Sequence, residues 1–281
     1  MRIVVTGAGG ALARAVLAIA GDHDVIPFTH ADLDVGDADA VAATIPACDA
    51  IVNLAAFTDV DGCEDDPARA QRDNGDAVGH LVAAARARGA ALLHVSTDYV
   101  FDGAKPTPYD EDDAPAPRSA YGRSKLAGEE HARALEAHLV VRTGSFFGIG
   151  RDFATRSAIA LAAGEDVRAI DDRVVSPTYV PDLAPRLLAL LATRRWGTYH
   201  LGGPEATTWY DLLQRVARIG GFAGRVVPQH AAELALRAPR PANAALASVR
   251  LAATGVPAFP TLDDALARFL TELRPRIAGA P

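Results

Sequence analysis

A tyrosine and a lysine four residues apart are the residues of this chain best placed to do chemistry. Tyr121 and Lys125 fall in a segment, residues 121–138, whose pattern is typical of a helix, so both side chains share one helix face. A neighbouring ammonium favours the phenolate and lowers the pKa of the phenol, which a phenol needs if it exchanges a proton near neutral pH. The same spacing occurs on ordinary solvated helices, so the pair alone does not establish a site.

The start of the chain predicts a nucleotide-binding turn. An apolar run is followed directly by glycines and then by a helical pattern, which indicates strand, tight turn and helix. Small residues spaced as GxxGxxA, at Gly7, Gly10 and Ala13, let the backbone approach a pyrophosphate. The helix N-terminus at Ala11 and Leu12 supplies N–H groups to the phosphates. A plain turn is the competing interpretation.

The composition excludes several classes of protein. The chain of 281 residues is 49% hydrophobic, yet it has no apolar run near the roughly 20 residues of a membrane span. A net charge of −7 and a pI of about 5.6 argue against a nucleic-acid partner. Cys48 and Cys63 lack metal-like spacing, and the acidic runs 65–66 and 111–113 are expected to be solvated turns, so we expect no metal site. The first strand begins at once, without a signal segment, which favours the cytoplasm.

Short apolar runs alternate with helical patterns through the first half of the chain. This alternation predicts an α/β fold, a Rossmann-type doubly wound parallel sheet that binds ligands at the carboxyl ends of its strands. The second half is less regular and predicts a smaller C-terminal lobe. We expect residues 1–145 to form the dinucleotide-binding domain, with residues 172–192 returning to it, and residues 146–171 and 193–281 to form the lobe. The expected strands are 3–6, 25–28, 50–54, 92–96, 139–143 and 198–201, and the expected helices are 12–20, 37–44, 69–88, 122–138, 153–163, 183–192, 208–219 and 262–274.

Five further segments resemble a known family. Together with the glycine turn, they are similar, in the same order, to the dTDP-4-dehydrorhamnose reductases, which are extended short-chain dehydrogenases/reductases. The most specific segment is STDYVFDG at residues 96–103. The resemblance implies a Rossmann domain with a small substrate-binding domain. The other segments are NLAAFTDVD at 53–61, YGRSKLAGE at 121–129, SPTY with DLA at 176–184, and RPAN at 240–243.

The resemblance implies an enzyme that reduces the C4 ketone of dTDP-4-dehydro-6-deoxy-L-mannose to give dTDP-L-rhamnose for polysaccharide biosynthesis. It assigns Thr97, Tyr121 and Lys125 as the catalytic residues. Hydride arriving at a ketone carbon builds negative charge on the oxygen, so a proton donor such as Tyr121 must lie within reach. Thr97 offers a second hydroxyl to the same oxygen. Lys125 stabilises the phenolate and, as the resemblance implies, reaches the nicotinamide ribose.

The resemblance and the expected topology also imply the cofactor contacts. An acidic residue at the end of the second strand would bind the ribose 2′-OH of NAD, but Thr29 and His30 stand there. These uncharged donors favour NADPH and leave NADH open, although His30 is equally well explained as an exposed histidine. The other expected contacts are Gly7, Gly10, Ala11, Leu12, Asp32, Leu33, Leu54, Ala55, Ala56, Thr58, Ser96, Tyr121 and Lys125.

The expected substrate side departs from the family in two places. Ser145 stands where many members have a tryptophan against the sugar, and Phe146 beside it should point elsewhere if the segment is extended. Residues 172–175 lack the glutamine and glycine that usually precede SPT. Both changes leave the exact keto sugar open. The expected substrate contacts are Thr97, Asp98, Tyr99, Ser145, Phe146 and Arg240.

Several roles stay open on the sequence alone. Arg240 suits either a diphosphate contact or a structural salt bridge, and Asn74 suits either a brace for the active-site backbone or a helix surface. An epimerase or dehydratase on this fold is an alternative, although dehydratases carry glutamate where Tyr99 stands. A non-catalytic NADP-binding regulatory subunit, of the kind that acts on methionine adenosyltransferase, is another, although the catalytic residues are intact. A homodimer is a candidate assembly.

Overall fold

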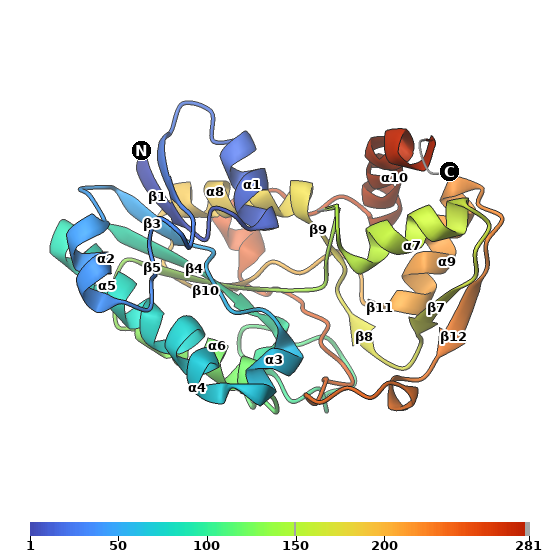
Figure 1. Ribbon diagram of the computed structural model, residues 1–281. Coiled ribbons are helices and arrows are strands. Elements are labelled where there is room, and N and C mark those ends of the chain that lie inside the picture. Colours follow the sequence, from blue (N-terminus) through green and yellow to red (C-terminus); the bar gives the residue numbers. More distant parts are fainter. Residues whose placement is uncertain (149, 279–281) are drawn as a thin grey trace.

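The computed structural model describes residues 1–148 and 150–278. Its larger part is a six-stranded parallel sheet in the order β10-β5-β4-β3-β1-β2 (Figure 1). The expected α/β Rossmann-type fold is therefore confirmed. The strands are β1 (Arg2–Thr6), β2 (Asp24–Phe28), β3 (Ala50–Asn53), β4 (Ala91–Thr97), β5 (His138–Thr143) and β10 (Gly197–His200).

Helices cover both faces of the sheet (Figure 1). Helices α1 (Ala11–Ala18) and α8 (Val180–Thr193) pack on one face, where Ile3 and Val5 of β1 point. Val4 points to the other face, into the core formed with α2 (Ala38–Thr44), α5 (Ala77–Arg88) and α6 (Ala120–Arg133). Strands buried on both sides need near-continuous apolar runs, which explains why the sequence signal for them was strong.

The order of the strands reverses between β1 and β3. The chain passes from β1 to β2 on one side, whereas β3, β4, β5 and β10 follow one another on the other side. In sheets of this kind the crevice at the carboxyl ends of the two central strands is where ligands bind. The glycine turn follows β1 and the segment NLAA ends β3, so both predicted cofactor loops lie at this crevice.

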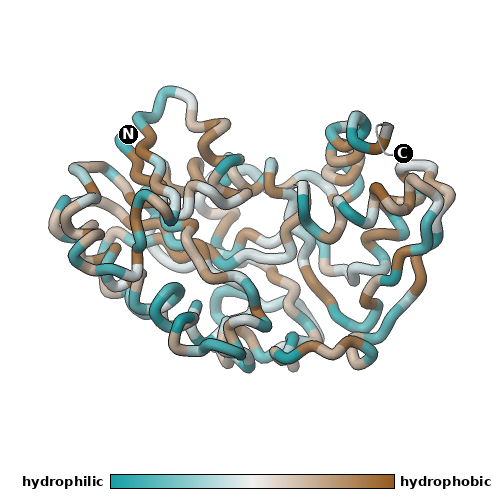
Figure 2. Tube along the Cα trace, in the orientation of Figure 1, coloured by the Kyte–Doolittle hydropathy of each residue, from teal (hydrophilic) through white to brown (hydrophobic). Residues whose placement is uncertain are grey.

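The smaller lobe has its own apolar core, in which Leu161, Leu213 and Phe269 are buried. Figure 2 shows hydrophobic stretches recurring inside both parts of the chain. The lobe contains β6 (Phe146–Phe147), β7 (Val167–Ile170), β8 (Val174–Val175), β9 (Thr178–Tyr179), β11 (Thr207–Thr208), β12 (Val226–Gln229), α7 (Phe153–Ala162), α9 (Trp209–Gly220) and α10 (Leu262–Ala278). Shorter helices are α3 (Val60–Asp65), α4 (Pro67–Ala70) and three 3₁₀ turns, Asp98–Val100, Ala231–Glu233 and Leu251–Thr254.

Three expectations about elements need correction. The single helix expected at residues 69–88 is divided into α4, a π-helical turn at Gln71–Asp76, and α5, because a π turn fits an extra residue that periodicity does not reveal. Helix α6 ends at Arg133, five residues before the expected end. Strand β10 was expected in the lobe, but it pairs with β5 and forms the edge of the central sheet, so the boundary at residue 193 does not hold for it.

Across the described residues, the helices are too short or too polar to cross a membrane.

Candidate active site

The glycine turn after β1 packs directly against the loop after β3. Gly7 has φ +70°, and a Cβ atom added to it would lie 2.5 Å from the backbone nitrogen of Ala55. Only glycine tolerates both this conformation and this approach. The Ala55 N–H donates to Asn53 Oδ1 (3.1 Å), and the Leu54 N–H donates to the Thr6 carbonyl (3.2 Å). The structure therefore brings together the two loops that were predicted to line the cofactor.

The N-terminus of α1 is free to bind an anion. Gly10 is its N-cap and provides no side-chain hydrogen bond, and the first turn, which is fully described, contains no acidic residue. A Cβ atom added to Gly9 would meet nothing within 4 Å, so this turn borders open space. The first N–H groups of a helix lack intrahelical partners, and those of Ala11 and Leu12 fit a dinucleotide pyrophosphate.

The turn after β2 contains a carboxylate, Asp32, whose charge bears on the choice of cofactor. The N–H and hydroxyl of Thr29 both donate to Asp32 Oδ2, at 2.9 and 2.7 Å. The Thr29 hydroxyl is the main cause that lowers the pKa of Asp32. His30 is exposed, which was one of its two open interpretations, and the Leu33 side chain is buried in the core.

Strand β4 and helix α6 bring together the two hydroxyls that were predicted to be catalytic. Thr97 ends β4, and Tyr121 lies in the first turn of α6, where Ser119 caps the helix by accepting a hydrogen bond from the Gly122 N–H (3.0 Å). A side chain at Gly122 would collide with the Tyr99 carbonyl, so glycine lets α6 approach the end of β4. The rings of Tyr99 and Tyr121 meet edge to face, with centroids 5.9 Å apart. The three residues therefore lie together where β4 ends and α6 begins, as predicted: Thr97, Tyr99 and Tyr121.

The electrostatics of Tyr121 differ from the expectation. Burial raises the pKa of Tyr121, and a hydrogen bond from the Thr97 side chain opposes this rise. Lys125 was expected to lower that pKa. Its ammonium instead donates to the Val95 carbonyl (2.7 Å) and lies 3.4 Å from His94 Nε2. Burial lowers the pKa of Lys125 to about 8, although the negative charge of Glu129 acts to raise it.

Asp98 is a buried carboxyl without a cation in contact among the described residues. Its Oδ1 accepts a hydrogen bond from Thr97 Oγ1 (2.9 Å), and its carboxylate lies so close to Gly144 that any side chain there would collide with it. Burial raises the pKa of Asp98 to about 7, and hydrogen bonds from Thr97 and the local backbone only partly offset this. Burial likewise raises the pKa of Tyr99 to about 12.

The residues expected on the substrate side differ from one another in conformation and contacts. Ser145, at the position of the family tryptophan, has φ +52°, a left-handed conformation that is unfavourable for a residue other than glycine. Phe146 is half-buried and packs against the core of the sheet. Arg240 Nη1 donates to Asp61 Oδ1 (2.9 Å), which is the salt-bridge alternative. Burial raises the pKa of the Tyr99 phenol and the charge of Arg240 opposes part of this rise, so the arginine lies near the predicted site.

Asn74 is a buried brace and not a surface residue. It lies in the π-helical turn, where its Oδ1 accepts from the Phe57 N–H (2.8 Å) and its Nδ2 donates to the Phe57 carbonyl (3.0 Å). The same Nδ2 donates to Ser124 Oγ (3.1 Å) in α6. Asn74 therefore ties the loop after β3, which continues to Thr58, to the helix that carries Tyr121.

Three polar residues at this site were missed by the sequence analysis. Asn53, His94 and Glu129 are all buried. Ser96 was expected to contact the cofactor, but its hydroxyl donates to Glu129 Oε1 (2.6 Å), because alternate residues of β4 point to opposite faces. The signal that could have found them is a polar residue within an apolar strand, since buried polar groups need partners.

The lobe also holds a polar group that the sequence analysis did not single out. Asp171, Asp172 and His230 place one possible ligand atom each within 4.8 Å of one another. His230 Nδ1 lies 3.4 Å from Asp171 Oδ1, and Asp172 Oδ1 accepts from the Ala231 N–H (3.0 Å). Asp171 Oδ1 is buried and has no hydrogen-bond partner among the described residues.

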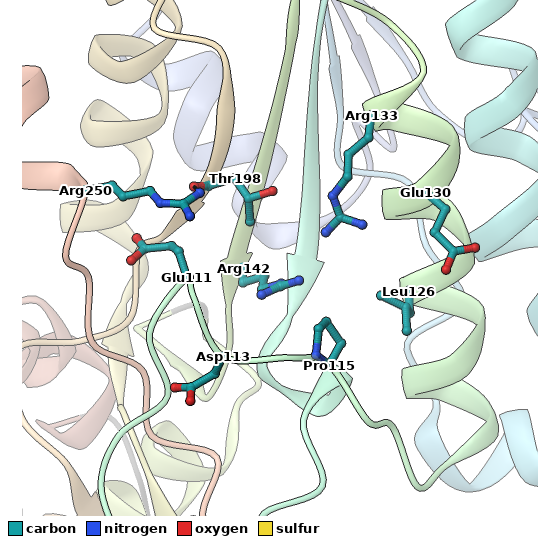
Figure 3. A pocket seen from close by; sticks show the side chains of 9 residues that line it. All are labelled: Glu111, Asp113, Pro115, Leu126, Glu130, Arg133, Arg142, Thr198 and Arg250. Atoms are coloured by element: carbon teal, nitrogen blue, oxygen red, sulfur yellow. Dashed lines mark hydrogen bonds between the residues drawn. The ribbon is translucent and has the colours of Figure 1, made fainter.

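A cavity of about 400 Å³ lies beside α6 (Figure 3). Arg133 and Glu130 extend from α6 toward it, and Arg142 of β5 points into it. Glu111, which was expected in a solvated turn, is buried at its rim and accepts from the His200 N–H (2.8 Å) and the Val249 N–H (2.9 Å). The residues that line this cavity do not include Thr97, Tyr121 or Lys125.

Comparisons with known proteins agree with this geometry. The family described as "RmlD substrate binding domain" matches residues 1–275. A dTDP-4-dehydrorhamnose reductase of Mycobacterium tuberculosis is 38% identical over 280 residues, which cover 96% of this chain and 92% of the relative. A probable dTDP-4,6-dihydroxy-2-methyloxan-3-one 4-ketoreductase of Streptomyces antibioticus is 38% identical over 91% of this chain and 90% of the relative.

A solved structure extends the agreement to three dimensions. The dTDP-4-dehydrorhamnose reductase of Bacillus anthracis, in complex with NADP, superimposes with a TM-score of 0.92 at 29% identity, over 96% of this chain and 99% of that one. The likeness covers both the sheet and the lobe. The chain belongs to the dTDP-4-dehydrorhamnose reductase family.

Proposed function

We propose that this protein is an NADPH-dependent oxidoreductase that reduces the C4 ketone of dTDP-4-dehydro-6-deoxy-L-mannose to give dTDP-L-rhamnose. The observation that carries the proposal is the meeting of the Thr97 and Tyr121 hydroxyls at the carboxyl end of β4, on the crevice side of the sheet. Membership of the reductase family and the NADP complex of the Bacillus anthracis relative support the choice of reaction and cofactor.

The residues of the chain supply the proton and the stabilisation of charge. Because its pKa is raised, Tyr121 is protonated at neutral pH and can act as the acid toward the carbonyl oxygen. The Thr97 hydroxyl donates to Asp98 in the structure (2.9 Å) and, once turned toward the substrate, would offer a second hydrogen bond to that oxygen as its negative charge develops. Lys125, on the same face of α6, is the cation that would stabilise the phenolate left behind. NADPH, when bound, supplies the hydride.

The crevice between β1 and β3 is the proposed cofactor site. The α1 N-terminus and the glycine turn would hold the pyrophosphate, and the β3 loop would line the dinucleotide. Asp32 at the adenosine end is an exposed carboxylate, which is the observation that keeps NADH open as an alternative cofactor. The proposed contacts are Gly7, Gly10, Ala11, Leu12, Thr29, His30, Asp32, the Leu33 backbone, Leu54, Ala55, Ala56, Thr58, Tyr121 and Lys125.

A different 4-keto-6-deoxy sugar is the second candidate substrate. Ser145 replaces the family tryptophan, and the Streptomyces antibioticus relative, whose name is that of another dTDP-sugar 4-ketoreductase, is as similar as the Mycobacterium tuberculosis enzyme. We propose that Asp98, Tyr99 and the neighbourhood of Arg240 face the substrate whichever sugar is correct. A panel of dTDP-4-keto sugars would separate the two candidates.

The decisive experiment follows NADPH oxidation by its absorbance with dTDP-4-dehydrorhamnose as substrate, with the product identified by NMR. We expect turnover, slower turnover with NADH, and a loss of most of the turnover in Tyr121→Phe. Lys125→Met should weaken both cofactor binding and turnover. Binding of NADPH without turnover of any sugar in the panel would contradict an enzyme and favour a regulatory subunit.

Location and assembly complete the proposal. A biosynthetic reductase that draws on NADPH and a nucleotide sugar would work in the cytoplasm. A homodimer is the proposed assembly, and light scattering on the purified protein would test it through the molar mass. A mass near 29.3 kDa, that of one chain, would contradict a dimer.

A further inference from the structure

A line of buried polar side chains crosses the sheet from β1 to α6. Thr6 Oγ1 donates to Asn53 Oδ1 at 2.7 Å. Asn53 Nδ2 lies 3.0 Å from His94 Nδ1, and His94 Nε2 lies 3.4 Å from the Lys125 Nζ atom. All four side chains are at most 2% exposed, so each polar atom depends on its protein partners.

The orientation of the Asn53 amide is fixed by a backbone donor. The Ala55 N–H donates to the same oxygen that accepts from Thr6, at 3.1 Å. A backbone N–H cannot accept, so this side of the amide must be the oxygen. The nitrogen of the amide therefore faces His94 and donates to its Nδ1.

The tautomer of His94 follows from that donor. A ring nitrogen that accepts a hydrogen bond carries no proton, so the single proton of the neutral ring is on Nε2. Burial and the charge of Lys125 lower the pKa of His94 well below its ordinary value, so the ring stays neutral. His94 therefore presents an N–H group, and not a lone pair, to Lys125.

Lys125 meets this N–H group with its own amine. An uncharged amine has one lone pair and can accept from His94 while it donates to the Val95 carbonyl. A charged ammonium has only donors and would place two N–H groups against each other. Of the other groups whose charge acts on Lys125, Glu129 on the same helix favours the charged form, whereas burial favours the uncharged one.

We propose that His94 is a positioning residue for Lys125: fixed by Asn53 as an Nε2–H donor, it holds the lysine amine in place and favours its uncharged form before the cofactor binds. The line ends in an amide and a threonine inside the sheet, where each hydrogen bond fixes the orientation of the next group. The inference rests on the proposed function only in giving Lys125 a part in the reaction.

The test is an NMR titration of the whole chain with ¹³C-labelled lysine. Lys105 and Lys125 are the only lysines in the sequence, and Lys105→Arg assigns the two signals. In the wild type we expect Lys125 to titrate well below the usual lysine pKa of about 10.4. In His94→Phe, which keeps a buried ring but removes the donor, its pKa should rise by about one pH unit, the preference of a single hydrogen bond.

The outcome separates positioning from packing. If His94 only fills space, His94→Phe leaves the pKa of Lys125 unchanged, and the proposal is overturned. Lys105 is the control for the fold, because its pKa is raised mainly by its hydrogen bond to Asp113, away from His94, and should not change.

A second measurement covers a variant that does not fold. In ¹⁵N-histidine spectra of the wild type, His94 should show a proton on Nε2. His200 is the internal contrast, since its Nδ1 lies 3.1 and 2.9 Å from the carbonyls of Tyr109 and Ala247 and must carry the proton. Two buried rings that both carry the proton on Nδ1 would overturn the proposal. These measurements need neither cofactor nor sugar, so their result does not depend on the enzyme assay. A failed assay would not contradict the role of His94, and a successful assay would not restore it if the NMR result contradicts it.

Discussion

Helix α6 carries two buried ionisable groups one turn apart, and their surroundings are opposite. Around Glu129, two arginines and a serine converge: Arg142 donates twice to the carboxylate, at 2.9 and 2.8 Å, and Arg133 and Ser96 donate once each, both at 2.6 Å. Burial alone would raise the pKa of Glu129, but these partners outweigh it and lower the pKa. This cluster stays charged.

Around Lys125 the burial is similar but the compensation is missing among the described contacts. The Lys125 amine donates to the Val95 carbonyl and faces a neutral histidine, while Asp98 depends on hydrogen bonds alone. The pKa of Lys125 therefore falls to about 8 and that of Asp98 rises to about 7. Burial without compensating partners moves the pKa values of Lys125 and Asp98 toward neutral pH, where proton transfer is useful. At Glu129 the partners compensate for the burial, and the group stabilises the fold.

The largest expected effect is on catalysis, at the uncompensated end of the helix. Tyr121→Phe removes the proton donor and leaves the ring, so kcat should fall by about 10²–10⁴ while NADPH affinity stays the same. The measurement is steady-state kinetics with a separate fluorescence titration of the cofactor. A variant that keeps its full rate would contradict the role of Tyr121.

Substitutions in the charged cluster around Glu129 should lower the unfolding free energy of the protein. Arg142 is 2% exposed, and Arg142→Met leaves Glu129 buried without its main partner, which should cost about 3–5 kcal/mol of unfolding free energy. Urea denaturation measures the loss. The double variant Arg142→Met with Glu129→Leu is the matched control, because it removes both charges and should recover much of the stability. A loss of the same size in the double variant would show that packing, and not charge, is the cause.

Asp98 should give the pH dependence of stability. Its pKa is raised on folding, so the unfolded chain ionises first, and the wild type loses stability as the pH rises from about 4 to about 7. Asp98→Asn removes this titration, so its stability relative to the wild type should grow over that range by about 4 kcal/mol and then level off. Denaturation curves at several pH values measure this. A constant difference across the range would contradict the raised pKa.

The smallest effect tests how far the compensation depends on burial. Arg133 donates to the same carboxylate as Arg142, but its side chain is 36% exposed. Because solvent screens such a pair, Arg133→Ala should cost less than about 1 kcal/mol in the same urea experiment. Equal losses for Arg133→Ala and Arg142→Met would remove the distinction drawn here between the two arginines.

Local pattern alone was enough for the framework of this protein. The apolar strands, the glycine turn at Gly7 and the spacing of Tyr121 and Lys125 are properties of short segments, and the structure has each of them. The segment at residues 96–103 indicated the family, because Thr97 and Tyr99 belong to one continuous motif. These features needed no knowledge of which segments lie side by side.

Only the tertiary structure decided the states of the side chains. That Ser96 faces Glu129, that Asn53 fixes the ring of His94, and that β10 completes the sheet all depend on segments far apart in the chain. The sequence predicted that Lys125 would lower the pKa of Tyr121, but burial raises that pKa instead. A pKa depends on the solvent excluded and the partners supplied by the whole fold, and neither is present in a local pattern.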